Sequence, residues 1–356
     1  MTKVRVRKPG APLDKIGVLS DETRERLQAL SVTTAEELLG MISADPEATS
    51  AFLGDDGDLA RVQADLGQNV GLEAMALLGD SEEEHFAMGA IPPAGIETEE
   101  RADPQLFEDR VLPAVAEGQH VDVGQGAEIG GCMGPLRDQG KRGTCVAHAV
   151  CALAECLFFK KTGDRLDFAE QFLYWNAKEH DGKPEKEGTL IEVALGLSVS
   201  DGNCLEGTWP YDPAKIPGDV GQGPPPAGAA SEAEERVLLR VEPLGERSTK
   251  DVCDRLDTGK PVALSIPVFQ NWDGNPAVNT FGEIPMPLPT SKCVGGHAMC
   301  AVGYGPDPDR PGGGYLILRN SWGEDWAPQS PVAPGHALLP FLYFELYGWE
   351  SFSADL

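Results

Sequence analysis

The chain has 356 residues, of which 41% are hydrophobic, so it can bury at least one sizeable core and is longer than a single typical domain. Against 29 Lys and Arg stand 57 Asp and Glu, a formal net charge of -28 that repels nucleic-acid phosphates and anionic membranes. We therefore expect no nucleic acid and no membrane among its partners, and we interpret the acidity as a solvated surface with a basic protein partner as the alternative.

Localisation is indicated by the N-terminus and by the cysteines. The first fifteen residues carry a basic cluster without an apolar stretch behind it, and no later stretch is long enough to span a bilayer. The cysteines are scattered over the chain and lack the density of a small disulfide scaffold. We expect mostly reduced thiols in a cytoplasmic protein, although a mature fragment of a longer precursor would look the same. The eight cysteines are Cys132, Cys145, Cys151, Cys156, Cys204, Cys253, Cys293 and Cys300.

Residues 1–80 are predicted to form a small helical module, because capping residues stand before short apolar runs. The predicted helix starts are Ser20–Asp21, Thr33–Thr34 with Glu36–Glu37, Asp45–Pro46 and Asp58. The string LSVTTAEELL weakly resembles the helix-hairpin-helix and SAM-like group, some of whose members bind DNA. Since the region is acidic, we expect a protein partner or a packing role in place of DNA.

The rest of the chain is predicted to be a linker followed by an α+β unit. Residues 81–118 form the linker, with a helix around Leu106 to Val115, and residues 119–356 form the larger domain. Residues 145–200 are mainly helical in pattern, residues 215–230 form an exposed Pro/Gly-rich loop, and the later apolar runs are predicted strands. Helices first and strands afterwards predict two subdomains that meet at a cleft.

The chemistry is indicated by Cys145, which follows a turn-rich Gly-Lys-Arg-Gly segment and begins an apolar helical run. Unpaired N–H groups and the positive end of the helix dipole stabilise a thiolate there, and the thiolate is the form that attacks. His297 stands in GGHAMCAVGYG, and Asn320 follows the run YLILR. The alternative for a free cysteine is a small buried hydrophobe, which is the role that we expect for Cys151 and Cys156.

Cys145, His297 and Asn320 in that order, with Gln139 six residues before the cysteine, resemble the papain-like C1 family. The strings DQGKRGTC, GGHAMCAVGYG and ILRNSWG carry the resemblance, and FAEQFLYW and TWPYDP add to it more weakly. It spans residue 119 to the C-terminus. The resemblance implies a helical subdomain and a β-barrel-like subdomain with a cleft between them, and a thiol peptidase that acts on proteins or peptides without a cofactor.

The resemblance implies a role for each residue that matches a family motif. Cys145 would be the nucleophile, His297 its acid/base partner and Asn320 the residue that orients His297. Gln139 and the backbone N–H of Cys145 would bind the oxyanion. Trp322 would cover the His–Asn hydrogen bond, and Gly188, followed by Thr189, is the nearest candidate for the glycines that line the substrate site.

The chain also departs from the family pattern. Arg142 stands where secreted members carry a second cysteine, Val146 replaces the usual aromatic residue, and the stretch after NSWG lacks its glycines. The first change fits a reducing compartment, and the other two leave the chemistry intact but leave the wall of the cleft beyond the scissile bond undefined by the resemblance. We expect His148 to be a packed helix residue and not a second base.

Several alternatives stay open from the sequence. A zinc site formed by Cys293, His297, Cys300 and Cys132 is disfavoured because paired ligands on a turn are missing, so we predict no metal. Cys132 and Cys293 could form a disulfide or be neighbouring thiols. The thioester could serve a deamidase or transpeptidase, or the fold could be a catalytically silent binding scaffold. The linker could cover the cleft, or it could tether a module that recruits a partner protein.

Overall fold

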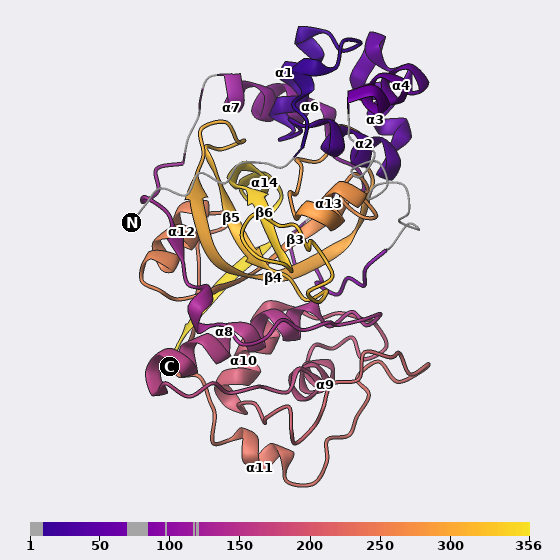
Figure 1. Ribbon diagram of the computed structural model, residues 1–356. Coiled ribbons are helices and arrows are strands. Elements are labelled where there is room, and N and C mark those ends of the chain that lie inside the picture. The colour runs from indigo at the N-terminus through magenta and orange to yellow at the C-terminus, as the bar shows by residue number, and fades with distance from the viewer. Residues whose placement is uncertain (1–9, 70–84, 97, 117, 119–120) are drawn as a thin grey trace.

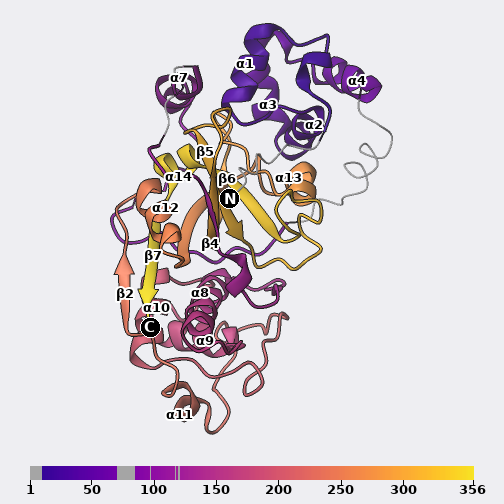
Figure 2. The ribbon, with the colours of Figure 1, turned by 60° about the vertical axis from the view of Figure 1, so that its left-hand side comes forward.

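The computed structural model describes residues 10–69, 85–96, 98–116, 118 and 121–356. Its three layers are visible in Figures 1 and 2: the N-terminal helices, a central antiparallel sheet, and a helical half formed by residues 139–238 on the far side of the sheet. None of the described helices is long and apolar enough to cross a membrane. The expected α+β class is confirmed.

The N-terminal module, by which we mean residues 10–69, consists of short capped helices. Ser20 accepts a hydrogen bond from the backbone N–H of Thr23, and Thr34 and Glu37 form the predicted capping box. Asp45 caps the next helix, in which proline occupies the first turn. The predicted starts are therefore confirmed. The module contains α1 (Asp21–Ala29), α2 (Ala35–Ala44), α3 (Pro46–Leu53), α4 (Leu59–Asn69) and the 3₁₀ turns Leu13–Lys15 and Gly54–Asp56.

The helical half begins with α8 (Cys145–Thr162), whose side chains are buried for most of its length because it is apolar on all sides. It continues with α9 (Glu170–His180) and α10 (Ile191–Ser200). The Pro/Gly-rich stretch forms turns and ends in the short helix α11 (Ala229–Ala233). Residues 145–200 are thus mainly helical, as predicted.

The seven-stranded sheet has the order β2-β7-β3-β4-β5-β6, with β1 paired to β4. All of its ladders are antiparallel, and the sheet is open, so the expected β-barrel-like subdomain is not a closed barrel. The strands are β1 (Ala127–Glu128), β2 (Arg240–Pro243), β3 (Val262–Phe269), β4 (Cys293–Pro306), β5 (Gly314–Arg319), β6 (His336–Pro340) and β7 (Glu350–Asp355).

The remaining helices connect or flank these layers. The linker carries α6 (Pro104–Leu106), a π-helical turn over Phe107–Val111 and α7 (Leu112–Ala116), where one helix was expected. The 3₁₀ turn Gly130–Cys132 precedes the helical half. The sheet half adds α12 (Thr249–Asp257), α13 (Pro276–Phe281) and α14 (Phe341–Tyr347).

The sheet separates two cores because side chains alternate across a strand. In β3, Val262, Leu264 and Ile266 pack in a core that also contains Leu27, Leu38 and other residues of the N-terminal module. Ala263 instead faces the core that contains α8. The module therefore shares one continuous apolar core with the sheet. Its predicted boundaries stay a prediction, but deleting residues 1–118 would open this core.

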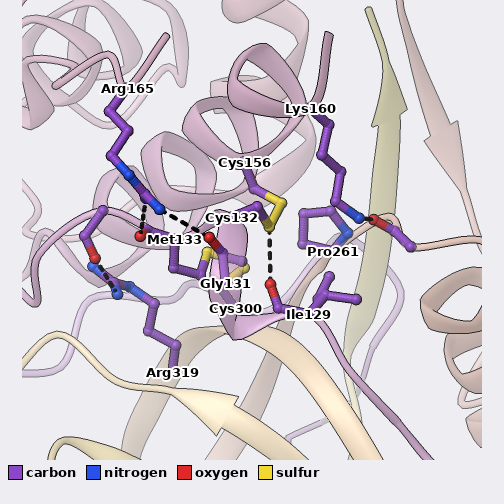
Figure 3. Close-up of a disulfide and its surroundings, with 12 residues drawn as sticks. Ile129, Gly131, Cys132, Met133, Cys156, Lys160, Arg165, Pro261, Cys300 and Arg319 are labelled. Atoms are coloured by element: carbon purple, nitrogen blue, oxygen red, sulfur yellow. Dashed lines mark hydrogen bonds between the residues drawn. A yellow bond between two sulfur atoms is a disulfide. The ribbon is translucent and has the colours of Figure 1, made fainter. Parts of the chain in front are cut away.

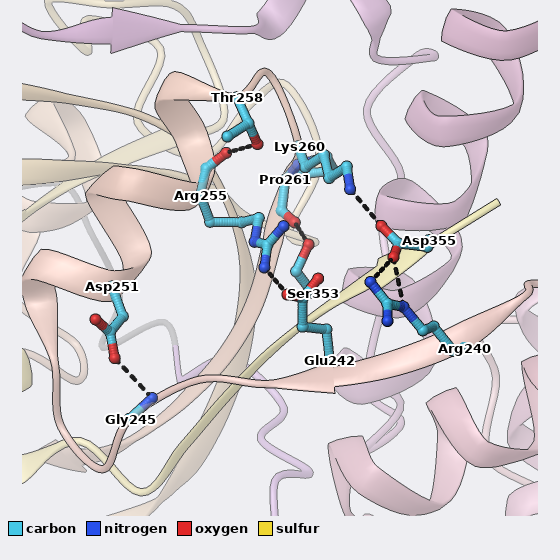
Figure 4. Close-up of polar contacts among 10 residues, drawn as sticks. All are labelled: Arg240, Glu242, Gly245, Asp251, Arg255, Thr258, Lys260, Pro261, Ser353 and Asp355. Atoms are coloured by element: carbon cyan, nitrogen blue, oxygen red, sulfur yellow. Dashed lines mark hydrogen bonds and ion pairs between the residues drawn. The ribbon is translucent and has the colours of Figure 1, made fainter.

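Charged contacts hold the last strand in place (Figure 4). Asp355 of β7 is paired with Arg240 of β2, with Nε and Oδ2 2.6 Å apart, and with Lys260 before β3. Ser353 donates a hydrogen bond of 2.9 Å to the carbonyl oxygen of Pro261. These contacts join the C-terminal strand to the strands on both sides of it.

A disulfide joins Cys132 to Cys156 of α8 (Figure 3). This corrects two expectations, since Cys132 was considered as a partner of Cys293, and Cys156 was interpreted as a free buried thiol. Cys293 is free and half-buried, and its thiol faces the carbonyl oxygen of Gly295 at 3.6 Å. The expected pairing was wrong because the partner of Cys132 depends on which face of α8 carries Cys156. The separation of two cysteines along the chain does not show this.

Replacing Cys132 and Cys156 by alanine should lower the free energy of unfolding by about 3 kcal/mol, because the crosslink closes a loop of moderate length in the unfolded chain. The bridged residues are 24 positions apart. Denaturant titration of the whole chain and of the double variant measures the difference. Equal stability of the two proteins would contradict a structural role for this disulfide.

Candidate active site

Cys145 is the first residue of α8, where the sequence places it, and its side chain is fully buried. Its sulfur accepts a hydrogen bond from the backbone N–H of Ala298 in β4 at 3.4 Å. Since Ala298 follows His297, this contact brings the helix start against the histidine strand. The predicted cysteine and histidine therefore meet where the helical half adjoins the sheet half.

His297 is held by the two other residues that the sequence associates with it. Its Nε2 lies 2.7 Å from Oδ1 of Asn320, directly after β5, and Trp322 stacks on the imidazole with ring centroids 4.5 Å apart. All three side chains are buried. Nδ1 of His297 has no hydrogen-bond partner among the described residues. The imidazole is thus oriented through one nitrogen, and the other nitrogen is left for chemistry.

Gln139 is fixed by bonds at both ends of its amide. Its Oε1 accepts a hydrogen bond of 2.6 Å from Oγ of Ser321. Its Nε2 donates to the carbonyl oxygens of Arg142 at 2.8 Å and of Ala87 at 2.9 Å. Because a hydroxyl satisfies the oxygen and two carbonyls need a donor, the amide nitrogen must face Ala87. A donor at this position can bind a carbonyl oxygen that approaches Cys145.

Ala87 belongs to a stretch that covers this junction, residues 85–91, which we call the covering segment. Ala90 donates its N–H to the carbonyl oxygen of Gly296 at 3.0 Å. Thr189 donates to the carbonyl oxygen of Gly89 at 2.9 Å and accepts from Ile91 at 3.0 Å, forming a parallel bridge. The segment is therefore hydrogen-bonded to the sheet half and to the helical half at once.

Two side chains of the covering segment strengthen its hold. Phe86 stacks on Trp322 with centroids 4.5 Å apart, and the Trp322 ring also stacks on His297. Nδ1 of His85 lies 2.7 Å from Oδ2 of Asp273. The indole N–H of Trp322 also donates to the carbonyl oxygen of Ala87 at 3.3 Å. The segment is anchored on both sides of the point where it passes Gln139.

Glycine is required where the covering segment passes Cys145. A Cβ added to Gly89 would overlap the carbonyl oxygen of Gly143, and one added to Gly188 would overlap that of Gly89. Gly188 also has a φ of 87°, a conformation that favours glycine. Gly188 and Trp322, the predicted substrate-binding residues, thus contact the chain's own segment in this structure.

Burial sets the charge state of the cysteine and histidine. Desolvation raises the pKa of Cys145 to about 11, against the lowering effect of backbone N–H groups that include Gly89. Desolvation lowers the pKa of His297 to about 4, against the raising effect of the hydrogen bond that the imidazole makes to Oδ1 of Asn320. Burial therefore disfavours the thiolate expected at the helix start while the segment covers the site, because the loss of water opposes the helix dipole.

Other residues singled out by sequence have different surroundings. His148 is buried, with Nδ1 3.0 Å from the carbonyl oxygen of Thr144 and its ring edge on Tyr211, as a packed helix residue would be. Among the described residues, no group of three His, Cys, Asp or Glu side chains could hold a metal ion. Arg142 stacks on Tyr211 and donates to Gln171 at 2.6 Å, a structural role for the residue found in place of the second cysteine.

Two contacts were missed in the sequence. Ser321 orients Gln139, and only its position directly after Asn320 could have indicated this. Trp272 makes an edge-to-face contact with His297 with centroids 6.3 Å apart, but it is separated from other motifs in the chain. The covering segment lies in the predicted linker, for which covering of the cleft was one of two alternatives, but its residues carry no recognisable motif because its contacts are mostly made by the backbone.

Comparison with known sequences decides the family. The family described as papain family cysteine protease matches residues 119–330. The chain belongs to the papain family. A peptidase C1-like protein of Acanthamoeba polyphaga mimivirus is 27% identical over 216 residues, covering 58% of this chain and 64% of that protein. Mouse cathepsin J is 28% identical over 200 residues, covering 55% of each. These alignments thus span less than two thirds of the curated relatives.

Solved structures show that the papain fold is present. Xylellain, a cysteine protease from Xylella fastidiosa, superposes with a TM-score of 0.59 at 20% identity, covering 77% of this chain and 98% of that one. A digestive procathepsin L 3 from larvae of Tenebrio molitor gives a TM-score of 0.50 at 17% identity, covering 72% and 82%. The fold is therefore that of a papain-family protein.

Cys145 should give no thiolate absorbance in the whole chain between about pH 5 and about pH 9, a range below the raised thiol pKa and above the lowered imidazole pKa. The ultraviolet difference between this chain and its Cys145→Ser variant, titrated with acid and base, measures the thiolate. A thiolate signal that develops below neutral pH in the intact chain would contradict the covered, uncharged state.

Proposed function

We propose that this papain-family chain is a cysteine endopeptidase that cuts protein or peptide substrates and is held inactive by residues 85–91. The observation that carries the proposal is the arrangement of Cys145 at the start of α8, beside His297 that is held by Asn320 beneath Trp322. A binding scaffold gains nothing from a histidine oriented through one nitrogen beside a cysteine. The reaction requires no cofactor.

In the proposed reaction, His297 takes the proton of the Cys145 thiol, and the thiolate attacks the carbonyl carbon of the scissile bond. Gln139 Nε2 and the backbone N–H of Cys145 bind the oxyanion. The imidazolium then gives its proton to the leaving amine as the carbon–nitrogen bond breaks, which leaves a thioester. Water, deprotonated by His297, hydrolyses the thioester, and the proton returns to the sulfur. Asn320 keeps the ring in place throughout.

The covering segment would occupy the substrate cleft without being cut. The carbonyl oxygen of Ala87 accepts the hydrogen bond of Gln139 Nε2, while the sulfur of Cys145 faces the backbone N–H of Gly89. Attack needs a carbonyl carbon before the sulfur and the oxyanion donors together. Since the segment belongs to the same chain, its effective concentration is high, and even a weak fit would compete with substrate.

Removing the covering segment from its place should activate the enzyme. Leucine at position 89 cannot fit against Gly143, so Gly89→Leu should raise turnover of a small peptide substrate several-fold or more. The matched control is Gly207→Leu at an exposed turn, where an added Cβ meets nothing within 4 Å. Equal activity of Gly89→Leu, Gly207→Leu and the parent chain would mean that the segment does not inhibit.

In the Gly89→Leu background, Gln139→Ala should lower kcat on the order of 10²-fold with little change in KM, because the donor acts mainly on the transition state. Cys145→Ala and His297→Ala should abolish turnover, and Asn320→Ala should leave part of it. Steady-state kinetics and product masses provide the readout. Hydrolysed peptide supports a peptidase, whereas deamidated or ligated peptide would replace it by the acyl-transfer alternative.

A further inference from the structure

The turn that follows β3, residues 270–275, is contacted by three parts of the molecule. Trp272 is buried, and its ring makes an edge-to-face contact with His297 and a tilted contact with Trp322, each with centroids 6.3 Å apart. The next residue, Asp273, pairs with His85 of the covering segment. The catalytic histidine and the segment that covers it are thus both in contact with one short turn.

The third contact comes from the N-terminal module. Asp45, buried where α2 meets α3, accepts a hydrogen bond of 2.8 Å from Oγ of Ser291. The same Oγ accepts the backbone N–H of Asn271 at 3.3 Å, directly before Trp272. Gln270 donates to the carbonyl oxygen of Ala44 at 3.3 Å. The first residues of the turn are therefore tied to the end of α2.

The module also contacts the end of the turn, through a glycine. A Cβ on Gly40 of α2 would lie 2.7 Å from Cβ of Ala277 in α13 and would overlap Oδ1 of Asn275. Asn275 caps α13, and its Nδ2 donates to the carbonyl oxygen of Asn271 at 2.8 Å. Glycine is a poor helix former, so its place inside α2 matches a need for close approach. Figures 1 and 2 show α2 beside α13.

We infer that the N-terminal module is a permanent positioning element of the active site, which holds the turn 270–275 so that Trp272 stays against His297. The inference rests on the proposed function and divides the residues before the papain-like domain into two opposed parts. The covering segment blocks turnover, whereas the module supports it. A detachable inhibitory module would have the opposite effect, because its loss would raise activity.

The physical reason is that, among the residues that the structure describes, a single hydrogen bond fixes the imidazole. Asn320 holds Nε2, and the ring plane is otherwise set by Trp322 on its face and Trp272 at its edge. A turn released from Asp45 and Gly40 would let Trp272 move and water reach the ring. Misplacement of a catalytic group by about 1 Å can cost as much as 10²-fold in rate, so a smaller loss is expected here.

The test uses the whole chain carrying Gly89→Leu, so that the cleft is open and the module is present. Gly40→Leu, which wedges α2 away from α13, should lower kcat on the order of 10-fold with KM nearly unchanged. Gly196→Leu is the matched control, because Gly196 also lies in a helix but an added Cβ meets nothing within 4 Å. Gly40→Ala should give an intermediate kcat.

A second pair of variants covers the case in which Gly40→Leu does not fold. Ser291→Ala and Asp45→Asn should each lower kcat. The double variant should have a kcat no lower than that of the more affected single variant, because both changes act on the same Asp45–Ser291 hydrogen bond. Ser50→Ala is the control for a general loss of module stability, since its Oγ donates at 2.8 Å to Gly57 within the module. It should leave kcat unchanged.

Equal kcat in the Gly40→Leu and Gly196→Leu chains, with faster hydrogen exchange in residues 35–44 proving that the module has moved, would overturn the inference. Purely additive effects of Ser291→Ala and Asp45→Asn would overturn it as well. If Gly89→Leu alone turned over no peptide, the proposed function would fail instead. The role of the contact between the module and the turn 270–275 would then be tested by the rate at which iodoacetamide alkylates Cys145 in the same variants. This rate should fall in Gly40→Leu but not in Gly196→Leu.

Discussion

The packing of α8 against β4 is the contact on which the rest of the structure depends. Cys145 and His297 are far apart in the chain, and they meet only because an all-round apolar helix lies against the sheet face formed by Ala298, Cys300 and Val302. The disulfide from Cys132 to Cys156 holds the preceding segment to the same helix. Everything else at the site orients one of these two residues or covers them.

Water is the second constraint, and it decides what the pair can do. A helix start favours a thiolate, but that gain is smaller than the cost of burying a charge. With the covering segment in place, burial raises the pKa of the Cys145 thiol and lowers the pKa of His297, which disfavours the charged form of both groups. The proposed inhibition has two physical components: the covering segment occupies the cleft, and burial disfavours proton transfer from Cys145 to His297. Moving the covering segment would remove both.

Much of this could be predicted from sequence, for reasons that differ between elements. The caps at Ser20, Thr34 and Asp45 are local hydrogen bonds, so the helix starts were predictable. The four residues Gln139, Cys145, His297 and Asn320 stand in strings with family spacing, and the structure brings them together. Their catalytic roles stay proposals, because geometry shows proximity and not turnover.

The rest depends on contacts between residues that are distant in sequence. The partner of Cys132 depends on how a helix is rotated, and the contacts of Trp272 depend on how two halves meet. The covering segment is held by backbone N–H and carbonyl groups of Gly89, Ala90 and Ile91, which every sequence possesses. Glycines such as Gly40 and Gly89, where any side chain would collide, leave a trace in the sequence, but nothing local shows what they approach.

The central claim is that Cys145 is the nucleophile and that residues 85–91 occupy the place of its substrate. The most direct measurement treats the whole chain with a thiol-reactive peptide epoxide, maps the adduct by mass spectrometry, and follows hydrogen exchange in the covering segment. We expect one slow adduct, on Cys145, with hydrogen exchange in residues 86–91 rising as the adduct forms. Labelling of another cysteine, or of Cys145 while the segment stays protected, would contradict it.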